Sequence, residues 1–353
     1  MELNDLLVQV LEQGGSDLHL TVGLPPMMRL NGKLLPMDGQ SLEPGDTKAM
    51  VYGIMRQDQR EALERHWEHD FAHSIPGRAR FRVNAYHQRG SVGAAFRLIP
   101  GEIKDFAQLG LPQVLEDFAR KPRGFVIVTG PTGSGKSTTL ASMIDHINKT
   151  QAVHIMTVED PIEYLHHHGN SMVNQREVGS DTESFATALK YVLRQDPDVI
   201  LIGEMRDLET VSAALTAAET GHLVLATLHT QDAVQTIDRI VDVFPPYQQQ
   251  QVRVQLAGTL QGIISQQLLP TIDSRSRVVA TEVLVPTAAI RNMIRESKTH
   301  QLPTAMQTGH QYGMSTMDES LADLYRRQRI TLDTALSRSI DQTVLRALLN
   351  KTQ

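Results

Sequence analysis

Cysteine is absent from the 353-residue chain. This absence excludes disulfide frameworks, thiolate zinc sites, iron–sulfur clusters and cysteine nucleophiles. Long apolar runs are also missing, because stretches such as 125–128 and 199–202 are far shorter than the roughly 18 residues that a membrane-spanning helix needs. The chain is long enough to bury a hydrophobic core, so covalent staples are unnecessary.

An excess of positive charge is lacking as well. The 34 basic and 40 acidic side chains give a formal net charge of -6, and only 5% of the residues are aromatic. A protein that tracks nucleic acid needs a basic channel, so we expect no nucleic-acid partner and consider a helicase the weakest hypothesis. The first residues include Glu2, Asp5 and Glu12 and lack the cationic segment of a secretory signal. We therefore expect a cytoplasmic protein that meets a membrane only through partners.

The first part of the chain, residues 1–99, predicts a small α+β domain. A helix is expected near the N-terminus and another across 46–65, and Asn31-Gly32 predicts a tight β-hairpin. Residues 79–85 alternate between apolar and polar side chains, as a half-buried strand does. Together these elements predict a mostly antiparallel sheet with helices.

The second part of the chain has a different pattern. Residues 100–112, with proline and glycine at both ends, predict an interdomain linker before a C-terminal domain over 113–353. In that domain short apolar strands alternate with helices, which predicts a parallel sheet covered on both faces. After about residue 247 we expect mainly helices, with one more strand near 277–285.

A phosphate-binding loop is predicted where residues 130–137 fit G-x-x-x-x-G-K-[ST] between a strand and a helix. The glycines let backbone N–H groups surround phosphates, and the helix N-terminus adds a positive dipole end. Lys136 would reach the β- and γ-phosphates and Ser137 would ligate Mg²⁺, so ATP and Mg²⁺ are the expected ligands. The residues expected to contact the nucleotide are Gly130, Pro131, Thr132, Gly133, Ser134, Gly135, Lys136, Ser137 and Thr138.

Acidic residues follow two apolar strands, at the sheet edge where parallel strands open on a ligand crevice. Glu204 comes after the strand 198–203, in the place of a Walker B carboxylate that polarises water or helps to hold Mg²⁺. Gly203 occupies the usual aspartate position, so metal binding would depend more on Ser137. Glu163 closes a second acidic cluster, for which a solvated turn is the alternative interpretation.

Histidine and arginine provide weaker signals. His229 lies at the phosphate end of the strand 222–228 and His222 at its other end, and the residues alone favour structural roles. The three histidines at 166–168 receive no role. Arginines on neighbouring strands of the first domain suit phosphate oxygens, as fingers from an adjoining domain or subunit, but a solvated sheet face is the alternative. These arginines are Arg78, Arg80, Arg82 and Arg97.

In this order the motifs resemble the secretion ATPase superfamily and, within it, the PilT-type retraction ATPases of bacterial type IV pili. The Asp box of that family matches 155–164, its Walker B segment 198–207 and its His box 220–230. Residues 289–296 read AIRNMIRE and resemble the AIRNLIRE motif of the retraction branch, with Met293 in place of leucine. The lack of cysteine agrees with this branch, because assembly and type II secretion ATPases usually carry a tetracysteine zinc module.

The resemblance implies an α/β protein with a smaller N-terminal PAS-like α+β domain and a C-terminal RecA-like P-loop NTPase domain. It implies a homo-hexameric ATPase motor that powers pilus retraction and twitching motility, at the cytoplasmic face of the inner membrane, through a pilus platform protein. Glu204, Glu163 and His229 would be catalytic, with Arg82 and Arg97 as candidate fingers. Two alternatives stay open: an accessory retraction ATPase that depends on a paralogous partner, and a related secretion or conjugation ATPase.

Overall fold

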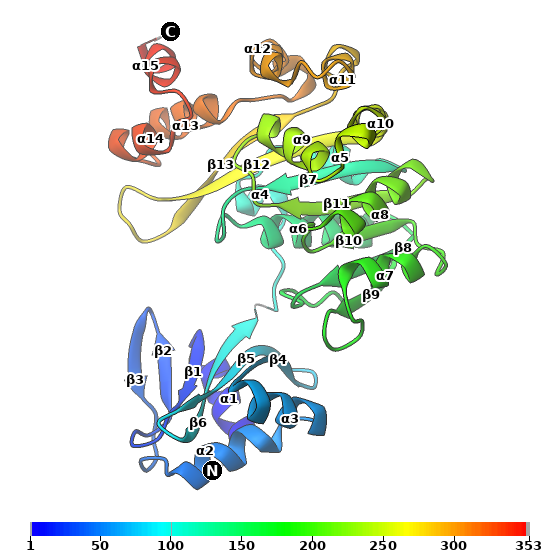
Figure 1. Ribbon diagram of the computed structural model, residues 1–353. Helices are drawn as coiled ribbons and strands as arrows, with labels where there is room; N and C mark the ends of the chain where they lie inside the picture. The colour runs from blue at the N-terminus through cyan, green and yellow to red at the C-terminus, as the bar shows by residue number, and fades with distance from the viewer. Residues whose placement is uncertain (1, 100, 351–353) are drawn as a thin grey trace. The chain divides into compact units, whose positions relative to one another are not determined.

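The computed structural model describes residues 2–99 and 101–350 and divides the chain into two compact units, Met1–Glu102 and Ile103–Gln353 (Figure 1). Helix α4 (Phe106–Leu109) lies inside the segment 100–112 that the sequence predicts as a linker. Its Phe106 is buried in the core of the second unit, and Asp105 accepts a hydrogen bond from the Gln108 N–H (2.7 Å) as its helix cap. The ordered second unit therefore begins before residue 113.

The first unit is a six-stranded antiparallel sheet with its helices on one face. Helices α1 (Leu3–Glu12), α2 (Pro44–Gly53) and α3 (Gln57–His66) bury their apolar sides against that face, which confirms the predicted small α+β domain. The hairpin turn has Asn31 and Gly32 at positive φ, as predicted. In sheet order the strands are β3 (Lys33–Pro36), β2 (Met27–Leu30), β1 (Asp17–Leu20), β6 (Ser91–Ile99), β5 (Ala79–Gln88) and β4 (Glu68–Ile75).

The single helix predicted across 46–65 is wrong, because the chain forms α2 and α3 with a break between them. Arg56 is extended, and its N–H donates to the Gln59 side chain (3.0 Å), which starts a new helix. The Arg60 guanidinium donates to the Tyr52 carbonyl (2.6 Å) near the end of α2. Side chains thus form hydrogen bonds with backbone groups at both helix ends. The break contains no proline that would have predicted it from the sequence.

The second unit contains a seven-stranded sheet that is parallel except for the pairing of β12 with β13. The strand β12 contradicts the sequence prediction of a mainly helical segment after residue 247 with one strand. β12 pairs in parallel with β7, so a strand from late in the chain completes the phosphate-loop side of the sheet. In sheet order the strands are β13 (Arg277–Leu284), β12 (Leu260–Pro270), β7 (Gly124–Thr129), β11 (Leu223–Leu228), β10 (Val199–Ile202), β8 (His154–Glu159) and β9 (Met172–Glu177).

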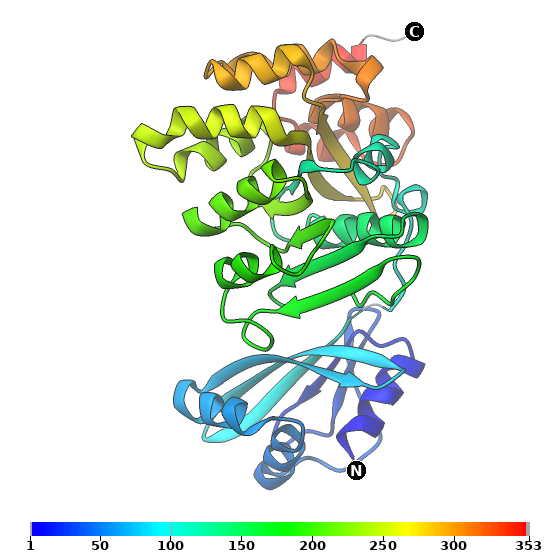
Figure 2. The same cartoon turned by 90° about the vertical axis from the view of Figure 1, so that its right-hand side faces the viewer.

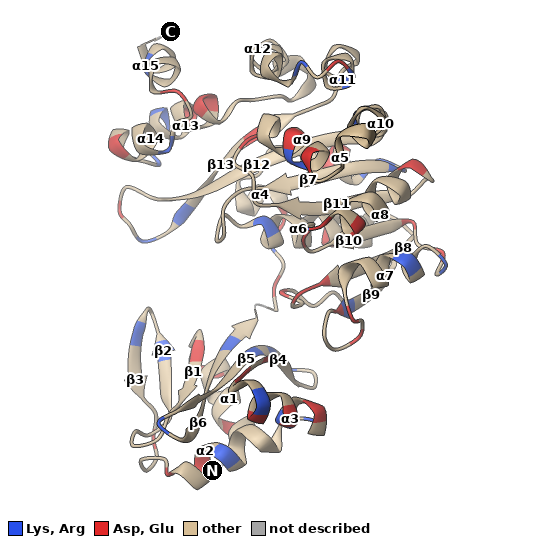
Figure 3. Cartoon of the chain, viewed as in Figure 1, with Lys and Arg blue, Asp and Glu red and all other residues tan. Residues whose placement is uncertain are grey.

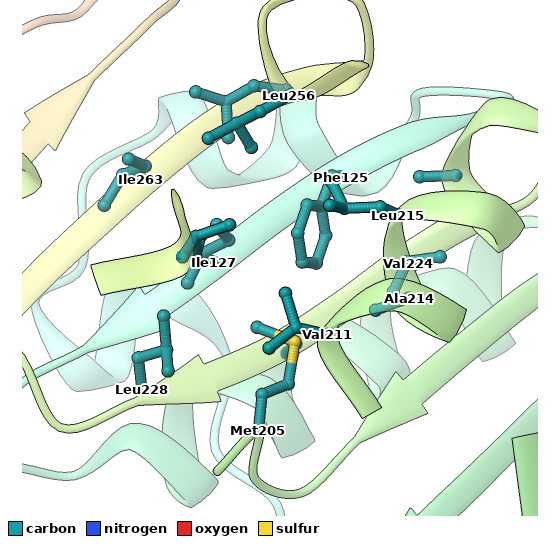
Figure 4. Packing of buried hydrophobic residues seen from close by; sticks show 14 of the residues in the cluster. Phe125, Ile127, Met205, Val211, Ala214, Leu215, Val224, Leu228, Leu256 and Ile263 are labelled. Carbon is teal, nitrogen blue, oxygen red and sulfur yellow. The ribbon is translucent and has the colours of Figure 1, made fainter. Parts of the chain in front are cut away.

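Two hydrophobic layers cover the sheet, as the alternation of strands and helices predicts. Phe125 and Ile127 of β7 pack into the layer under α7 (Phe185–Val192), α8 (Leu208–Glu219), α9 (Ala233–Asp242) and α10 (Pro246–Thr259) (Figures 2 and 4). Val126 and Val128 pack into the opposite layer under α4, α5 (Val114–Ala119) and α6 (Lys136–Thr150). The central strands β7, β10 and β11 carry no charged residue (Figure 3).

The C-terminal helices form a separate small cluster on the ends of β12 and β13. Leu269 of β12 and Ala280 of β13 are buried there against Met317, Leu321 and Leu345. No helix within the described ranges is long and apolar enough to cross a membrane. The remaining helices are α11 (Ala288–Arg295), η1 (Thr299–Gln301), α12 (Leu302–Gln307), η2 (His310–Tyr312), α13 (Met317–Arg326), α14 (Leu332–Arg338) and α15 (Gln342–Asn350).

Gly262 provides a test of this packing. A Cβ added at Gly262 would lie 2.3 Å from the Phe118 ring, so we expect Gly262→Ala to lower the free energy of unfolding by about 1–3 kcal/mol. Thermal denaturation should show a decrease in Tm of roughly 2–4 °C per kcal/mol. The control is Gly258→Ala in α10, where a Cβ meets nothing within 4 Å and the alanine favours the helix. Equal Tm values for the two variants would contradict the packing argument.

Candidate active site

The phosphate loop leaves β7 at Gly130 and enters α6 at Lys136, as the sequence predicts. Gly130, Gly133 and Gly135 all have positive φ, which other residues adopt only with strain. A Cβ on Gly130 would lie 2.3 Å from the Gln266 carbonyl oxygen of β12. The loop therefore takes a course that only glycine permits, and its N–H groups stand at the start of a helix where anions bind.

Lys136 is folded back over the loop that precedes it. Its Nζ donates to the carbonyl oxygens of Gly130 (2.9 Å) and Pro131 (3.1 Å), and the residue is buried. Burial lowers the pKa of Lys136 below its ordinary value, and the negative charges of Glu204 and Glu163 oppose that shift. A buried cation surrounded by carbonyl dipoles and nearby carboxylates is well placed to bind a phosphate.

Glu204 follows β10 at the sheet edge shared with the phosphate loop. Its Oε1 accepts from Arg206 Nε (2.5 Å) and lies 3.1 Å from His229 Nε2, and its Oε2 accepts from Arg206 NH2 (2.7 Å). The glycine at position 203 has a steric reason, because its Cβ would lie 3.2 Å from the Glu159 Cα of β8. The carboxylate of this segment is thus carried by Glu204.

Charge and burial act in opposite directions on Glu204. Burial by itself raises the pKa of its carboxyl, but the hydrogen bond from Arg206 and the positive charges of His229, Arg206 and Lys136 outweigh it. The pKa of Glu204 therefore lies below its ordinary value. The carboxylate is ionised at neutral pH and available as a base or ligand.

The second acidic cluster divides into a shielded and an exposed carboxylate. Glu159 accepts from Thr157 Oγ1 (2.6 Å) and Gln175 Nε2 (3.1 Å), and burial raises its pKa above the ordinary value. Glu163 is exposed after a turn that contains the cis peptide Asp160-Pro161, and its charge acts on Lys136. Glu163, rather than Glu159, is thus the carboxylate of this cluster whose charge acts on the lysine of the phosphate loop.

The two histidines that flank β11 have different surroundings. His229, at the carboxyl end, is partly exposed and contacts Glu204. His222, at the other end, has its Nδ1 2.9 Å from the Ala217 carbonyl near the C-terminus of α8. The structure therefore groups His229 with the candidate catalytic residues and gives His222 a local structural contact.

The arginines Arg82 and Arg97 lie in the first unit as direct cross-strand partners on β5 and β6. Arg97 Nε donates to Asp17 Oδ1 (2.9 Å), and this carboxylate is itself buried. Burial raises the pKa of Asp17, but hydrogen bonds from Ser16 and Arg97 lower it below the ordinary value overall. Both arginines are exposed, but Arg97 is engaged in this ion pair within its own sheet.

Sequence reasoning missed three residues at this site. Arg206 lies in the matched Walker B segment, and its position two residues after Glu204 was the available signal. Tyr164 places its hydroxyl 2.9 Å from Thr138 Oγ1 of the phosphate loop helix. Gln266 of β12 donates to the Ser134 carbonyl (2.9 Å), a contact that sequence reasoning missed because it did not predict the strand β12.

The ion pair between Arg206 and Glu204 makes a measurable prediction. We expect Arg206→Gln to raise the pKa of Glu204, since the hydrogen bond and charge of Arg206 stabilise the ionised carboxylate. A ¹³C NMR titration of the glutamate carboxyl groups would follow it, with Arg120→Gln, whose ion pair with Glu116 is remote in sequence, as the control. An unchanged Glu204 titration in the Arg206 variant would contradict the assignment.

Known proteins resemble this chain over most of its length. The family model described as type II/IV secretion system protein matches residues 3–293. The type IV pilus retraction ATPase PilT of Pseudomonas aeruginosa is 50% identical over 95% of this chain and 97% of its own length. The type IV pilus ATPase PilU of the same organism is 44% identical over 99% of this chain and 91% of its own length.

A solved structure agrees with these similarities. The crystal structure of the pilus retraction motor PilT with bound ADP is 50% identical and has a TM-score of 0.92, covering 98% of this chain and 99% of the other. Both units and their order are thus those of a known two-part secretion ATPase. The chain belongs to the type II/IV secretion system protein family and, within it, to the PilT-type ATPases.

Proposed function

We propose that this chain is an ATP-hydrolysing motor that powers type IV pilus retraction and so twitching motility. The observation that carries the proposal is the group formed by Lys136 on the phosphate loop and Glu204 with His229 at the ends of neighbouring strands. The relatives reported above bear the names of a pilus retraction ATPase and of a retraction motor with bound ADP. Site and similarity thus support the same activity.

The residues of the site suit hydrolysis of ATP in a specific way. Lys136 would leave the loop carbonyls for the β- and γ-phosphates, and the loop N–H groups would share that negative charge. Glu204, assisted by Glu163, would accept a hydrogen bond from the attacking water and orient it in line with the γ-phosphate. His229, in contact with Glu204, would keep that carboxylate in position.

The residues present also fit a magnesium ion that travels with the nucleotide. Ser137 is the second residue of α6. Glu204 provides an ionised carboxylate that interacts electrostatically with Lys136, the residue before Ser137. Magnesium in such sites is held by phosphates and only one or two protein ligands, so no larger acidic cluster is required. When bound, it would neutralise charge on the β- and γ-phosphates. We assign Ser137 and Glu204 as its protein ligands.

The assembly and location are further parts of the proposal. We propose a homo-hexamer at the cytoplasmic face of the inner membrane that acts on a pilus platform protein. In it, an arginine from the first unit would complete the site, with Arg82 as the stronger candidate, because Arg97 already pairs with Asp17. We also propose a paralogous retraction ATPase as a further partner, because the family includes the pilus ATPase PilU beside PilT.

The catalytic role of Glu204 is tested by Glu204→Gln, which keeps shape and removes the ionised carboxylate. We expect the steady-state ATPase rate to fall by about 100-fold or more, while ADP binding persists. The matched control is Glu209→Gln on the exposed first turn of α8, which should hydrolyse ATP at nearly the wild-type rate. A Glu204→Gln rate within twofold of wild type would overturn the role.

The second candidate function is that of an accessory ATPase that depends on a paralogue. It deserves a test because this chain is also 44% identical to PilU, a pilus ATPase found beside PilT in one organism. We expect the chain to restore twitching motility to a strain that lacks both proteins, since its site residues are complete. Restoration only in the presence of PilT would favour the accessory function.

A further inference from the structure

Gln266 of β12 lies behind the phosphate loop and is almost completely buried, with 1% of its surface exposed. β12 runs parallel to β7, with Ile264 opposite Val128 and Ser265 opposite Thr129, so Gln266 comes next to the first residue of the loop. The Thr129 hydroxyl donates to Ser265 Oγ (3.0 Å) and ties the strands together there. A primary amide in such a place is costly to bury unless it makes hydrogen bonds.

Gln266 touches the loop at three of its residues. Its Nε2 donates to the Ser134 carbonyl oxygen (2.9 Å), and the same nitrogen would lie 3.3 Å from a Cβ on Gly135. Its backbone carbonyl would lie 2.3 Å from a Cβ on Gly130. Gln266 thus forms part of the surface against which the loop packs, and its backbone carbonyl leaves no room for a side chain at Gly130.

Two polar atoms at this contact stay unpaired. Gln266 Oε1, an acceptor, and Ser134 Oγ, a hydroxyl, are both buried, and neither finds a hydrogen-bond partner among residues 2–99 and 101–350. Both belong to residues that already meet through the amide-to-carbonyl hydrogen bond. An acceptor and a donor that stay unsatisfied on two residues already joined by a hydrogen bond point to a loop whose second hydrogen bond to β12 forms in another state.

We infer that Gln266 is a positioning residue for the phosphate loop. The Nε2 of its side chain donates to the Ser134 carbonyl, and its Oε1 accepts a hydrogen bond from the Ser134 hydroxyl when the loop closes on a nucleoside di- or triphosphate. This inference rests on the proposed ATPase function and deepens it. Gln266 acts through the loop and need not touch the nucleotide. Replacing Gln266 should therefore weaken the binding of ligands that carry a β-phosphate. The part of the affinity that comes from the nucleoside should stay unchanged.

The first experiment compares ADP and AMP binding to the full-length chain by titration calorimetry. Gln266→Met keeps the side-chain volume and removes the amide, so we expect ADP affinity to fall about tenfold while AMP affinity stays unchanged. KM for ATP should rise by a similar factor, with kcat little changed. The control is Gln267→Met, the neighbouring half-exposed residue of β12, which should match wild type.

Two outcomes of this experiment would overturn the inference. One is an unchanged ADP affinity in Gln266→Met. The other is an equal loss of ADP and AMP affinity together with a lower Tm, which would indicate a general structural role.

A double-mutant cycle provides a second test, because Ser134→Ala should weaken ADP binding in wild type but cause no further loss in Gln266→Met. Independent effects of the two substitutions would also contradict the pairing. ADP binding is measured directly, so failure of the ATPase proposal would appear separately as absent ATP hydrolysis in wild type.

Discussion

The close approach of the phosphate loop to β12 is the constraint on which the rest of the site depends. Gly130 passes so near the Gln266 carbonyl that no side chain fits between them, and the loop then enters α6 at a buried lysine. A buried cation is tolerated only where dipoles and opposite charges surround it. The loop carbonyls and the carboxylates Glu204 and Glu163 supply these, so loop, sheet and acidic residues are required together.

The topology of the sheet brings the carboxylates to that cation. β7, β11 and β10 are parallel neighbours, so their carboxyl ends open at one edge although the strands are far apart in the chain. The loops that follow β10 and β11 each end in a side-chain helix cap. Asp207 accepts from the Thr210 N–H after Glu204 and Arg206, and Asp232 accepts from the Gln235 N–H after His229. Because these loops run from buried strands to capped helices, the backbone that carries the functional side chains is held in place at both ends.

A further buried carboxylate joins the C-terminal helices to this arrangement. Glu282 of β13 accepts from the N–H of Ala233 (2.8 Å) and of Met317 (3.4 Å), the first residues of α9 and α13. Burial raises the pKa of Glu282 to about 7, although both hydrogen bonds oppose the shift. One side chain therefore links the helix that follows His229 to the cluster formed by α13–α15.

Sequence by itself determined the local parts of this protein. The G-x-x-x-x-G-K-S run between strand and helix, the strand ending at Glu204 and the turn at Asn31-Gly32 are encoded over a few consecutive residues, so pattern and propensity predict them. Tertiary structure decided what depends on distant residues: the parallel pairing of β12 with β7 and the contact of Gln266 with Ser134. It also decided that Arg97 pairs with Asp17, which lies 80 residues earlier in the chain. Such contacts join residues whose neighbours in sequence carry no trace of the partner, because burial and hydrogen bonding select them only once the chain has folded.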